Sequence, residues 1–189
     1  MNVIKAEAHI VQQLHLNLPE TLYYHGLHHT LDVRDAALRL AKLEDITDPE
    51  NLDLLTTAAL YHDAGFLKFY KNHEEESCRI ARAALPAFDY TQGQIAIICG
   101  MIMATKIPQS PKTILEQILC DADLDYLGRN DFEPIAATLY NELEARNMVG
   151  DQEAWNSTQI QFLTAHHYWT ASARSLRDEM KQRNLQSLL

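Results

Sequence analysis

Apolar residues recur along most of the chain every three or four positions, the spacing that places them on one face of an α-helix. Clusters of Pro, Gly, Asn, Asp, Ser and Thr separate these runs, and no run alternates β-branched and polar residues as a strand would. The pattern predicts an all-α chain of about eight helices. They are expected at residues 2–16, 29–43, 49–63, 73–85, 92–103, 111–127, 130–146 and 151–181.

Four of these helices carry a recognisable start signal. Two start with a capping residue followed by proline at the first helical position, and two resemble capping boxes, in which two side chains bond the first free backbone N–H groups. The signals lie at Asp48–Pro49, Asn72–Glu75, Thr91–Gln94 and Ser110–Pro111. The helix expected at 49–63 is apolar almost all round, so it is predicted to lie at the centre of the core.

The net charge of the chain argues against polyanionic partners. The chain contains 26 Asp and Glu against 16 Lys and Arg, which gives a formal net charge of -10. This charge repels polyanions and argues against long nucleic acid or an anionic membrane as a partner. A small anionic substrate is still compatible with it, because a bound cation inverts the field inside a pocket.

The chain is expected to form one reduced domain. Its 189 residues can bury a substantial core without disulfides, and no repeat or flexible linker divides them, so we expect a single compact multi-helix bundle over residues 1–189. Cys78, Cys99 and Cys120 lie in apolar surroundings without a CxxC pair and are expected to be free thiols in a cytoplasmic protein. The polar segment after Ser172 is the candidate contact for a homodimer.

Three short segments concentrate metal-binding side chains. YYHGLHHT, residues 23–30, holds three of the nine histidines; taken alone, such a cluster would more often be a set of solvated loop residues. YHDAGF places His62 and Asp63 at the end of the most apolar helix, and CDADLDYLG adds three acids at 121–125. A buried imidazole beside a carboxylate is costly unless it is paired or bound to a cation. Such a donor set suits one divalent ion of Mn, Fe, Ni, Zn or Co, with Mg less favoured.

The order of these residues resembles the HD-domain superfamily of metal-dependent phosphohydrolases. In that pattern a histidine followed by Thr precedes a His-Asp pair, and an aspartate follows Ala in a later helix, as at Ala122. The resemblance covers about residues 20–145 and implies an HD-domain-like helical bundle. It implies metal ligands at His29, His62, Asp63 and Asp123. Asp121 is the alternative to Asp123 as the last ligand; otherwise Asp121 and Asp125 are expected to cap helices, lie on the surface or orient a ligand histidine.

The resemblance also suggests residues that would act on a substrate. Asp63 or Asp121 would orient the attacking water, and His25, four positions before His29, would line the pocket and meet a phosphate oxygen. Lys106 would clamp the phosphate from a turn between two helices. Lys68 and Lys71 are the rivals of Lys106 for that role, and each of the three lysines is more often a solvated surface cation.

The remaining histidines are assigned to the edges of the site or to packing. His73 is expected at the pocket edge, and His28 should point away from the pocket. His166 and His167 should pack within the last long helix, although His166 could instead cap the pocket. Residues 101–106 offer no further histidine, which favours one metal over two.

These inferences predict an enzyme that hydrolyses a phosphomonoester or phosphodiester bond in a nucleotide-like small molecule. The segment AGFLK after the His-Asp pair lacks the acids of the guanosine tetraphosphate hydrolases of the superfamily, which makes that substrate a poor fit. The alternative is a non-catalytic helical scaffold that binds a nucleotide or regulates a partner. Completeness of the four-ligand set favours the enzyme, since buried charges without a metal would need another explanation.

Overall fold

The computed structural model describes all 189 residues and contains helices but no strand, which confirms the all-α prediction. The α-helices are α1 (Val3–Asn17), α2 (Leu27–Leu43), α3 (Pro49–Tyr61), α4 (His73–Ala84), α5 (Gln92–Thr105), α6 (Ile114–Asp123), α7 (Phe132–Glu144), α8 (Gln152–Ala165) and α9 (Ala171–Ser187). Three 3-10 segments join them, η1 (Ala64–Leu67), η2 (Leu85–Phe88) and η3 (Asp125–Gly128). None of the helices is both long and apolar enough to cross a bilayer.

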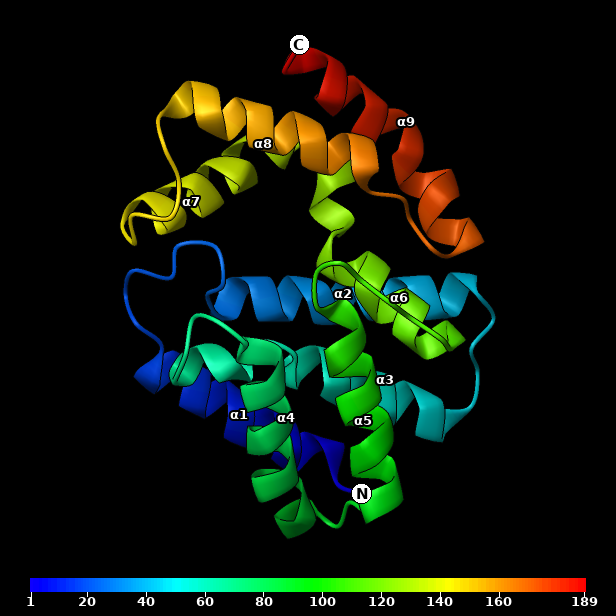
Figure 1. Cartoon of the computed structure of the whole chain (residues 1–189). Coiled ribbons are helices and arrows are strands. Elements are labelled where there is room, and N and C mark those ends of the chain that lie inside the picture. The colour runs from blue at the N-terminus through cyan, green and yellow to red at the C-terminus, as the bar shows by residue number, and fades with distance from the viewer.

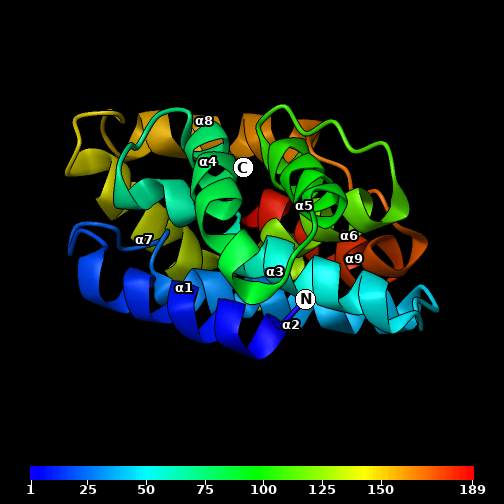
Figure 2. The ribbon, with the colours of Figure 1, turned by 90° about the horizontal axis from the view of Figure 1, so that it is seen from below.

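Helix α3 lies at the centre of the larger hydrophobic core, as its apolar sequence predicts. Its residues from Thr57 to Tyr61 are all buried, and it packs against α1, α2 and α5. Figure 2 shows α3 between the pair α1 and α2 on one side and α4 and α5 on the other. Cys78 and Cys99 belong to this core, and all three cysteines are buried free thiols, as expected.

A second, smaller hydrophobic cluster forms around η3, α7 and α8. Its buried residues include Leu127, Phe132, Trp155 and Leu163, and Tyr24 joins it from the loop before α2. In Figure 1, α7, α8 and α9 form a separate group at the top of the molecule, above α2 and α6. The space between the two clusters is where the candidate site residues meet.

A tight approach of η1 to α4 fixes the turn that carries the His-Asp pair. A Cβ atom at Gly65 would lie only 1.9 Å from the carbonyl oxygen of His73, so a larger residue there would push η1 away from α4. The Gly65 N–H also donates a hydrogen bond of 2.7 Å to the Ser77 hydroxyl. Since α3 ends at Tyr61, His62 and Asp63 occupy this constrained turn rather than a regular helix.

Two of the predicted helix starts are confirmed by side-chain caps. The Asp48 carboxylate accepts a hydrogen bond from the Asn51 N–H at 2.9 Å, with Pro49 at the first position of α3. Thr91 and Gln94 form a reciprocal capping box at the start of α5. Both signals rely only on neighbours in the sequence, which explains why the sequence alone reveals them.

Of the other two signals, the one at Asn72–Glu75 marks the correct start of α4 but forms no capping box, and the one at Ser110–Pro111 is wrong. Asn72 adopts a left-handed conformation with φ of 57° and makes no side-chain cap, because the chain must turn sharply from η1 into α4. Helix α6 begins at Ile114 rather than after Ser110, because Thr113 and Glu116 form the capping box there. Its end is also earlier than predicted, since the chain tightens into η3 after Asp123.

The predicted long last helix is broken into α8 and α9 by a tertiary contact. The buried Asp121 carboxylate accepts hydrogen bonds from the Trp169 N–H at 2.7 Å and from the Thr170 N–H and hydroxyl at 2.8 Å each. Thr170 in turn caps α9 by accepting from the Ala173 N–H. His166 and His167 therefore lie in the break between two helices and not within one helix, which corrects the sequence prediction.

We predict that Asp121→Ala lowers the free energy of unfolding by about 3 kcal/mol, because it leaves two buried backbone N–H groups and one hydroxyl without a partner. Chemical denaturation followed by circular dichroism would measure the loss. Asp35→Ala is the control: this aspartate is 64% exposed and pairs with Arg34, so its removal should cost less than about 1 kcal/mol. Equal losses for the two variants would contradict the anchoring role of Asp121.

Candidate metal centre

Four side chains from three separate helical segments converge at the junction of the two clusters. His29 belongs to the first turn of α2, His62 and Asp63 follow α3, and Asp123 is the last residue of α6. Helix α2 packs against both α3 and α6, which brings the three segments together. The sequence-predicted ligands thus share one location, although they are spread over 95 positions from first to last.

The donor atoms of these four residues are close to one another. Asp123 Oδ1 lies 3.2 Å from His29 Nε2 and 3.4 Å from His62 Nε2. Asp63 Oδ2 lies 3.2 Å from His62 Nε2 and 3.5 Å from His29 Nε2. For His29, His62 and Asp123, one ligand atom from each lies within 4.8 Å of the others, which is close enough for a single ion to contact all three.

Two buried atoms of this cluster have no hydrogen-bond partner, His62 Nε2 and Asp63 Oδ2. The other ring nitrogen of His62 donates to the Ala59 carbonyl at 2.7 Å, so Nε2 is the ring nitrogen that faces the carboxylates. Burial would lower the pKa of His62, but the carboxylates of Asp63 and Asp123 raise it well above its ordinary value. A site that attracts a proton this strongly also attracts a metal cation, and two imidazoles with two carboxylates fit a borderline divalent ion.

The structure separates the three neighbouring aspartates by role. Only Asp123 faces the histidines, while Asp121 anchors the start of α9 and so is turned away from the cluster. Asp125 accepts hydrogen bonds from Arg39 and Arg177 and is 2% exposed. Neither Asp121 nor Asp125 is therefore hydrogen-bonded to a candidate ligand histidine, and both carboxylates are engaged elsewhere.

His25 lies beside the cluster and is held by a residue that the sequence did not identify. The carboxylate of Glu142, in α7, is fully buried, accepts the N–H groups of Tyr24 and His25, and lies 2.5 Å from His25 Nδ1. Burial would raise the pKa of Glu142, but its bonds to His25 and to the two N–H groups hold it at about 2. This pairing keeps the proton of His25 on Nδ1 and leaves Nε2 free.

The sequence did not identify Glu142, because it lies among polar residues such as Asn141 and Glu144 and resembles part of a solvent-exposed helix face. In the structure Asn141 and Glu144 are indeed exposed. Tyr70 donates a fourth hydrogen bond, of 2.9 Å, to the same carboxylate. Only the packing of α7 against the segment before α2 shows that this acid is buried and supports the site.

The structure places His73 near the cluster as well. Its Nε2 lies 3.4 Å from Asp63 Oδ1, the carboxylate oxygen that does not face His62, and its ring stacks on Phe66 with centroids 4.1 Å apart. His25 stacks on Phe66 at 4.3 Å. His73 therefore lies at the pocket edge, the position expected from the sequence.

The three candidate lysines, Lys68, Lys71 and Lys106, lie outside the cluster. Lys106 Nζ pairs with the exposed Glu75 carboxylate at 2.5 Å, and Lys68 and Lys71 are exposed on the surface. His28 is exposed, and His166 lines a different cavity beside His167 and Trp169. The predicted phosphate clamp at Lys106 is therefore not part of the assembled cluster.

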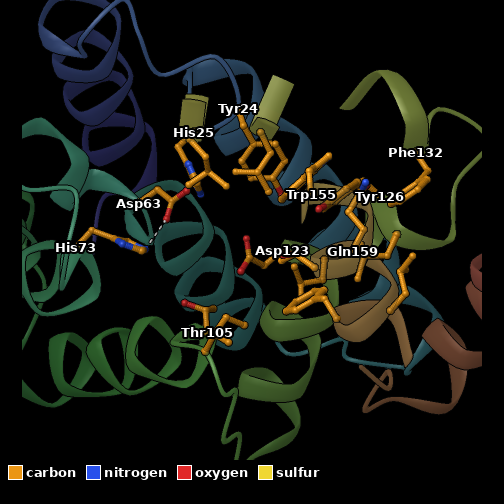
Figure 3. Close-up of a pocket in the computed structure, with 18 of the residues that line it drawn as sticks. Tyr24, His25, Asp63, His73, Thr105, Asp123, Tyr126, Phe132, Trp155 and Gln159 are labelled. Atoms are coloured by element: carbon orange, nitrogen blue, oxygen red, sulfur yellow. Dashed lines mark ion pairs between the residues drawn. The ribbon is translucent and has the colours of Figure 1, made fainter. Parts of the chain in front are cut away.

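A cavity of about 300 Å³ adjoins the cluster. Figure 3 shows Asp63, His25 and His73 on one side of it, Asp123 in the middle, and Trp155 on the opposite side. Two of the candidate ligands and both supporting histidines therefore reach the same space. This arrangement gives a small molecule access to the carboxylates of the cluster.

Comparisons with known proteins agree with this geometry. The sequence profile of the HD domain matches residues 26–125, which contain all four candidate ligands. A predicted HD superfamily hydrolase from an uncultured Thermotogales bacterium has the same fold, with a TM-score of 0.66 and 19% identity over 99% of this chain and 90% of that chain.

The Lin1889 protein from Listeria innocua is similar to the same degree, with a TM-score of 0.66 and 18% identity over 100% of this chain and 96% of that chain. No curated protein sequence matches the chain. The profile match covers more than half of the chain and includes the residues that form the cluster. The chain therefore belongs to the HD domain family.

Proposed function

We propose that this protein is a metal-dependent phosphohydrolase that cleaves a phosphomonoester or phosphodiester bond in a small, nucleotide-like molecule. The observation that carries the proposal is the pair of buried atoms without partners, His62 Nε2 and Asp63 Oδ2, next to the donor atoms of His29 and Asp123. These four residues would hold one divalent ion of Mn, Fe, Ni, Zn, Co or Mg. When bound, such an ion makes water a nucleophile near neutral pH and polarises a phosphoryl oxygen.

The residues around the ligands have separate tasks. Asp63 presents one carboxylate oxygen to the histidine ligands and the other to His73, so its position is fixed from two sides. It is the group that orients the attacking water. His25, with its proton held on Nδ1 by Glu142, directs Nε2 to the cavity, where it can take part in proton transfer or accept a hydrogen bond from a protonated phosphate.

Lys106 is left out of this machinery because its ammonium group is paired with Glu75 outside the cavity. The net charge of -10 supports a small molecule rather than long nucleic acid or an anionic membrane as the partner. Three buried free thiols agree with a cytoplasmic location. The last helix, α9, is the candidate contact for a homodimer.

Asp63→Asn tests the metal centre directly, since the amide removes one negative charge while keeping the shape of the side chain. We expect less than one metal ion per chain by elemental analysis and a loss of phosphatase activity of about 100-fold or more. The loss should exceed the roughly 10- to 100-fold effect of removing a residue that only hydrogen-bonds to a metal ligand, because Asp63 is itself a candidate ligand. Asp35→Asn, an exposed acid on α2, should keep both metal and activity. Full activity in metal-free Asp63→Asn protein would refute the proposed centre.

Glu142→Gln tests the orientation of His25. The amide oxygen of the substituted side chain can still accept the two backbone N–H groups, but its NH₂ group then faces His25 Nδ1 and favours the opposite tautomer. We expect kcat to fall by about 10- to 100-fold while metal content stays at the wild-type level. A purely structural role would instead lower the thermal stability and leave kcat of the folded fraction unchanged.

The same carboxylate should make stability depend on pH. Because the folded pKa of Glu142, about 2, lies below the usual value, its ionised form stabilises the fold above pH ~4.5, and that contribution is lost as the pH falls toward 2. The groups facing it are His25 and Tyr70. Denaturant titrations at several pH values should show wild type losing about 3 kcal/mol relative to Glu142→Gln over this range. Parallel curves for the two proteins would contradict the assignment.

A further inference from the structure

The cavity beside the candidate metal centre has two chemically different halves. One half ends at the carboxylates of Asp63 and Asp123. The other is lined by leucines and aromatic side chains of η3, α7 and α8, among them Leu127, Phe132 and Leu163. Figure 3 shows this division, with Asp63 and His73 on one side and Tyr126, Phe132, Trp155 and Gln159 on the other. A molecule bound at the carboxylates therefore extends toward an apolar chamber.

No lysine or arginine lines any part of the cavity. Lys106 follows the lining residue Thr105 in the chain, but its ammonium group is paired with Glu75. The only other charged acid of the lining is Glu74, which repels phosphate. His25 and His73 are the basic side chains of the lining, and both are already paired with carboxylates. A substrate with two or three phosphates would thus place at least one anionic group without a free cationic partner, which is unfavourable.

The far half offers apolar contact and little hydrogen bonding. Tyr126 and Phe132 stack with ring centroids 6.1 Å apart, and Trp155 is 6% exposed. On this side the amide of Gln159 and the hydroxyl of Thr158 are the polar groups of α8 that reach the cavity. Such walls gain free energy by covering apolar surface and give little to a sugar rich in hydroxyl groups.

The volume of about 300 Å³ is at the small end of the range for ligand pockets, roughly 300–1,000 Å³. It is also much larger than a packing defect, since folded interiors rarely leave voids bigger than a water molecule. Its position next to the buried carboxylates distinguishes it from a void in the second hydrophobic cluster. One small substrate with a short organic group fills it.

We infer that the substrate carries a single phosphate and an uncharged, largely apolar organic group, with the phosphate at the His-Asp cluster and the organic group in the chamber formed by η3, α7 and α8. The phosphate half of this inference rests on the proposed function. The apolar half rests on the lining of the cavity alone, so the two can be tested separately. Polyphosphates and dinucleotides are excluded as good substrates. The inference also narrows the proposed nucleotide-like class, because the apolar chamber fits an apolar organic group better than the sugar of a nucleoside monophosphate.

Calorimetric titration of the metal-loaded protein with stable phosphonates tests the inference without turnover. The probes are 1-naphthylphosphonate, methylphosphonate, neutral 1-naphthol and adenosine triphosphate, the weak ones measured by competition. We expect 1-naphthylphosphonate to bind at least about tenfold more tightly than methylphosphonate, because the ring system adds buried apolar area. Adenosine triphosphate should bind more weakly than 1-naphthylphosphonate.

Substitutions of Gln159 then locate the organic group in the chamber. Gln159→Glu has the same shape but places a carboxylate among the apolar walls, so it should abolish most of the naphthyl advantage and leave methylphosphonate affinity within about twofold. Gln159→Leu should keep or increase that advantage. Gln161→Glu, an exposed position two residues further along α8, carries the same charge change and should behave as wild type.

The outcomes separate the two proposals. Equal affinities for 1-naphthylphosphonate and methylphosphonate, or tighter binding of adenosine triphosphate, would overturn the inferred substrate class while leaving the metal centre intact. Binding of 1-naphthol that is lost in Gln159→Glu, without any binding of the phosphonates, would uphold the apolar chamber and overturn the phosphohydrolase proposal. Equal effects of Gln159→Glu and Gln161→Glu would place the organic group elsewhere.

Discussion

Two carboxylates and two imidazoles, all buried except the partly exposed Asp123, have their donor atoms 3.2 to 3.5 Å apart, and this concentration of polar groups is the constraint on which the site depends. His62 Nε2 and Asp63 Oδ2 lack hydrogen bonds there, so burying them carries a desolvation cost that a bound cation would offset. The most deeply packed helix, α3, delivers the His-Asp pair, and the close approach of Gly65 to α4 fixes the turn that holds it. The rigid core therefore keeps the donor atoms close together.

The second hydrophobic cluster contributes to the same site from the opposite side. Glu142 ties α7 to the segment before α2 and fixes the orientation of His25, while η3, α7 and α8 form the apolar wall of the adjoining cavity. Asp121 and Asp123 both belong to α6, but they face different partners. Asp123 faces the histidines, and Asp121 holds the start of α9. One carboxylate of α6 thus belongs to the candidate metal site, and its neighbour two positions earlier holds the fold together.

Membership of the HD domain family gives the cluster a functional context, and the cavity adds what is particular to this chain. A lining without lysine or arginine, beside a pair of carboxylates, is the observation behind our inference that the substrate carries a single phosphate. In that inference, the aromatic and leucine walls select the organic group by apolar contact. We therefore propose that α7 and α8 determine specificity, and that the phosphate is bound at the junction of α2, α3 and α6.

The sequence by itself determined the helical class, the buried position of α3, the caps at Asp48 and Thr91, and which residues were candidates for a metal site. These features depend on periodicity, on neighbouring residues or on the order of rare side chains. Tertiary structure alone decided the break before α9, the separation of Asp121 from Asp123, the burial of Glu142 and the pairing of Lys106 with Glu75. Each of these is set by contacts between segments distant in sequence, because the partner of a charged side chain depends on which helices pack together rather than on its neighbours in the chain.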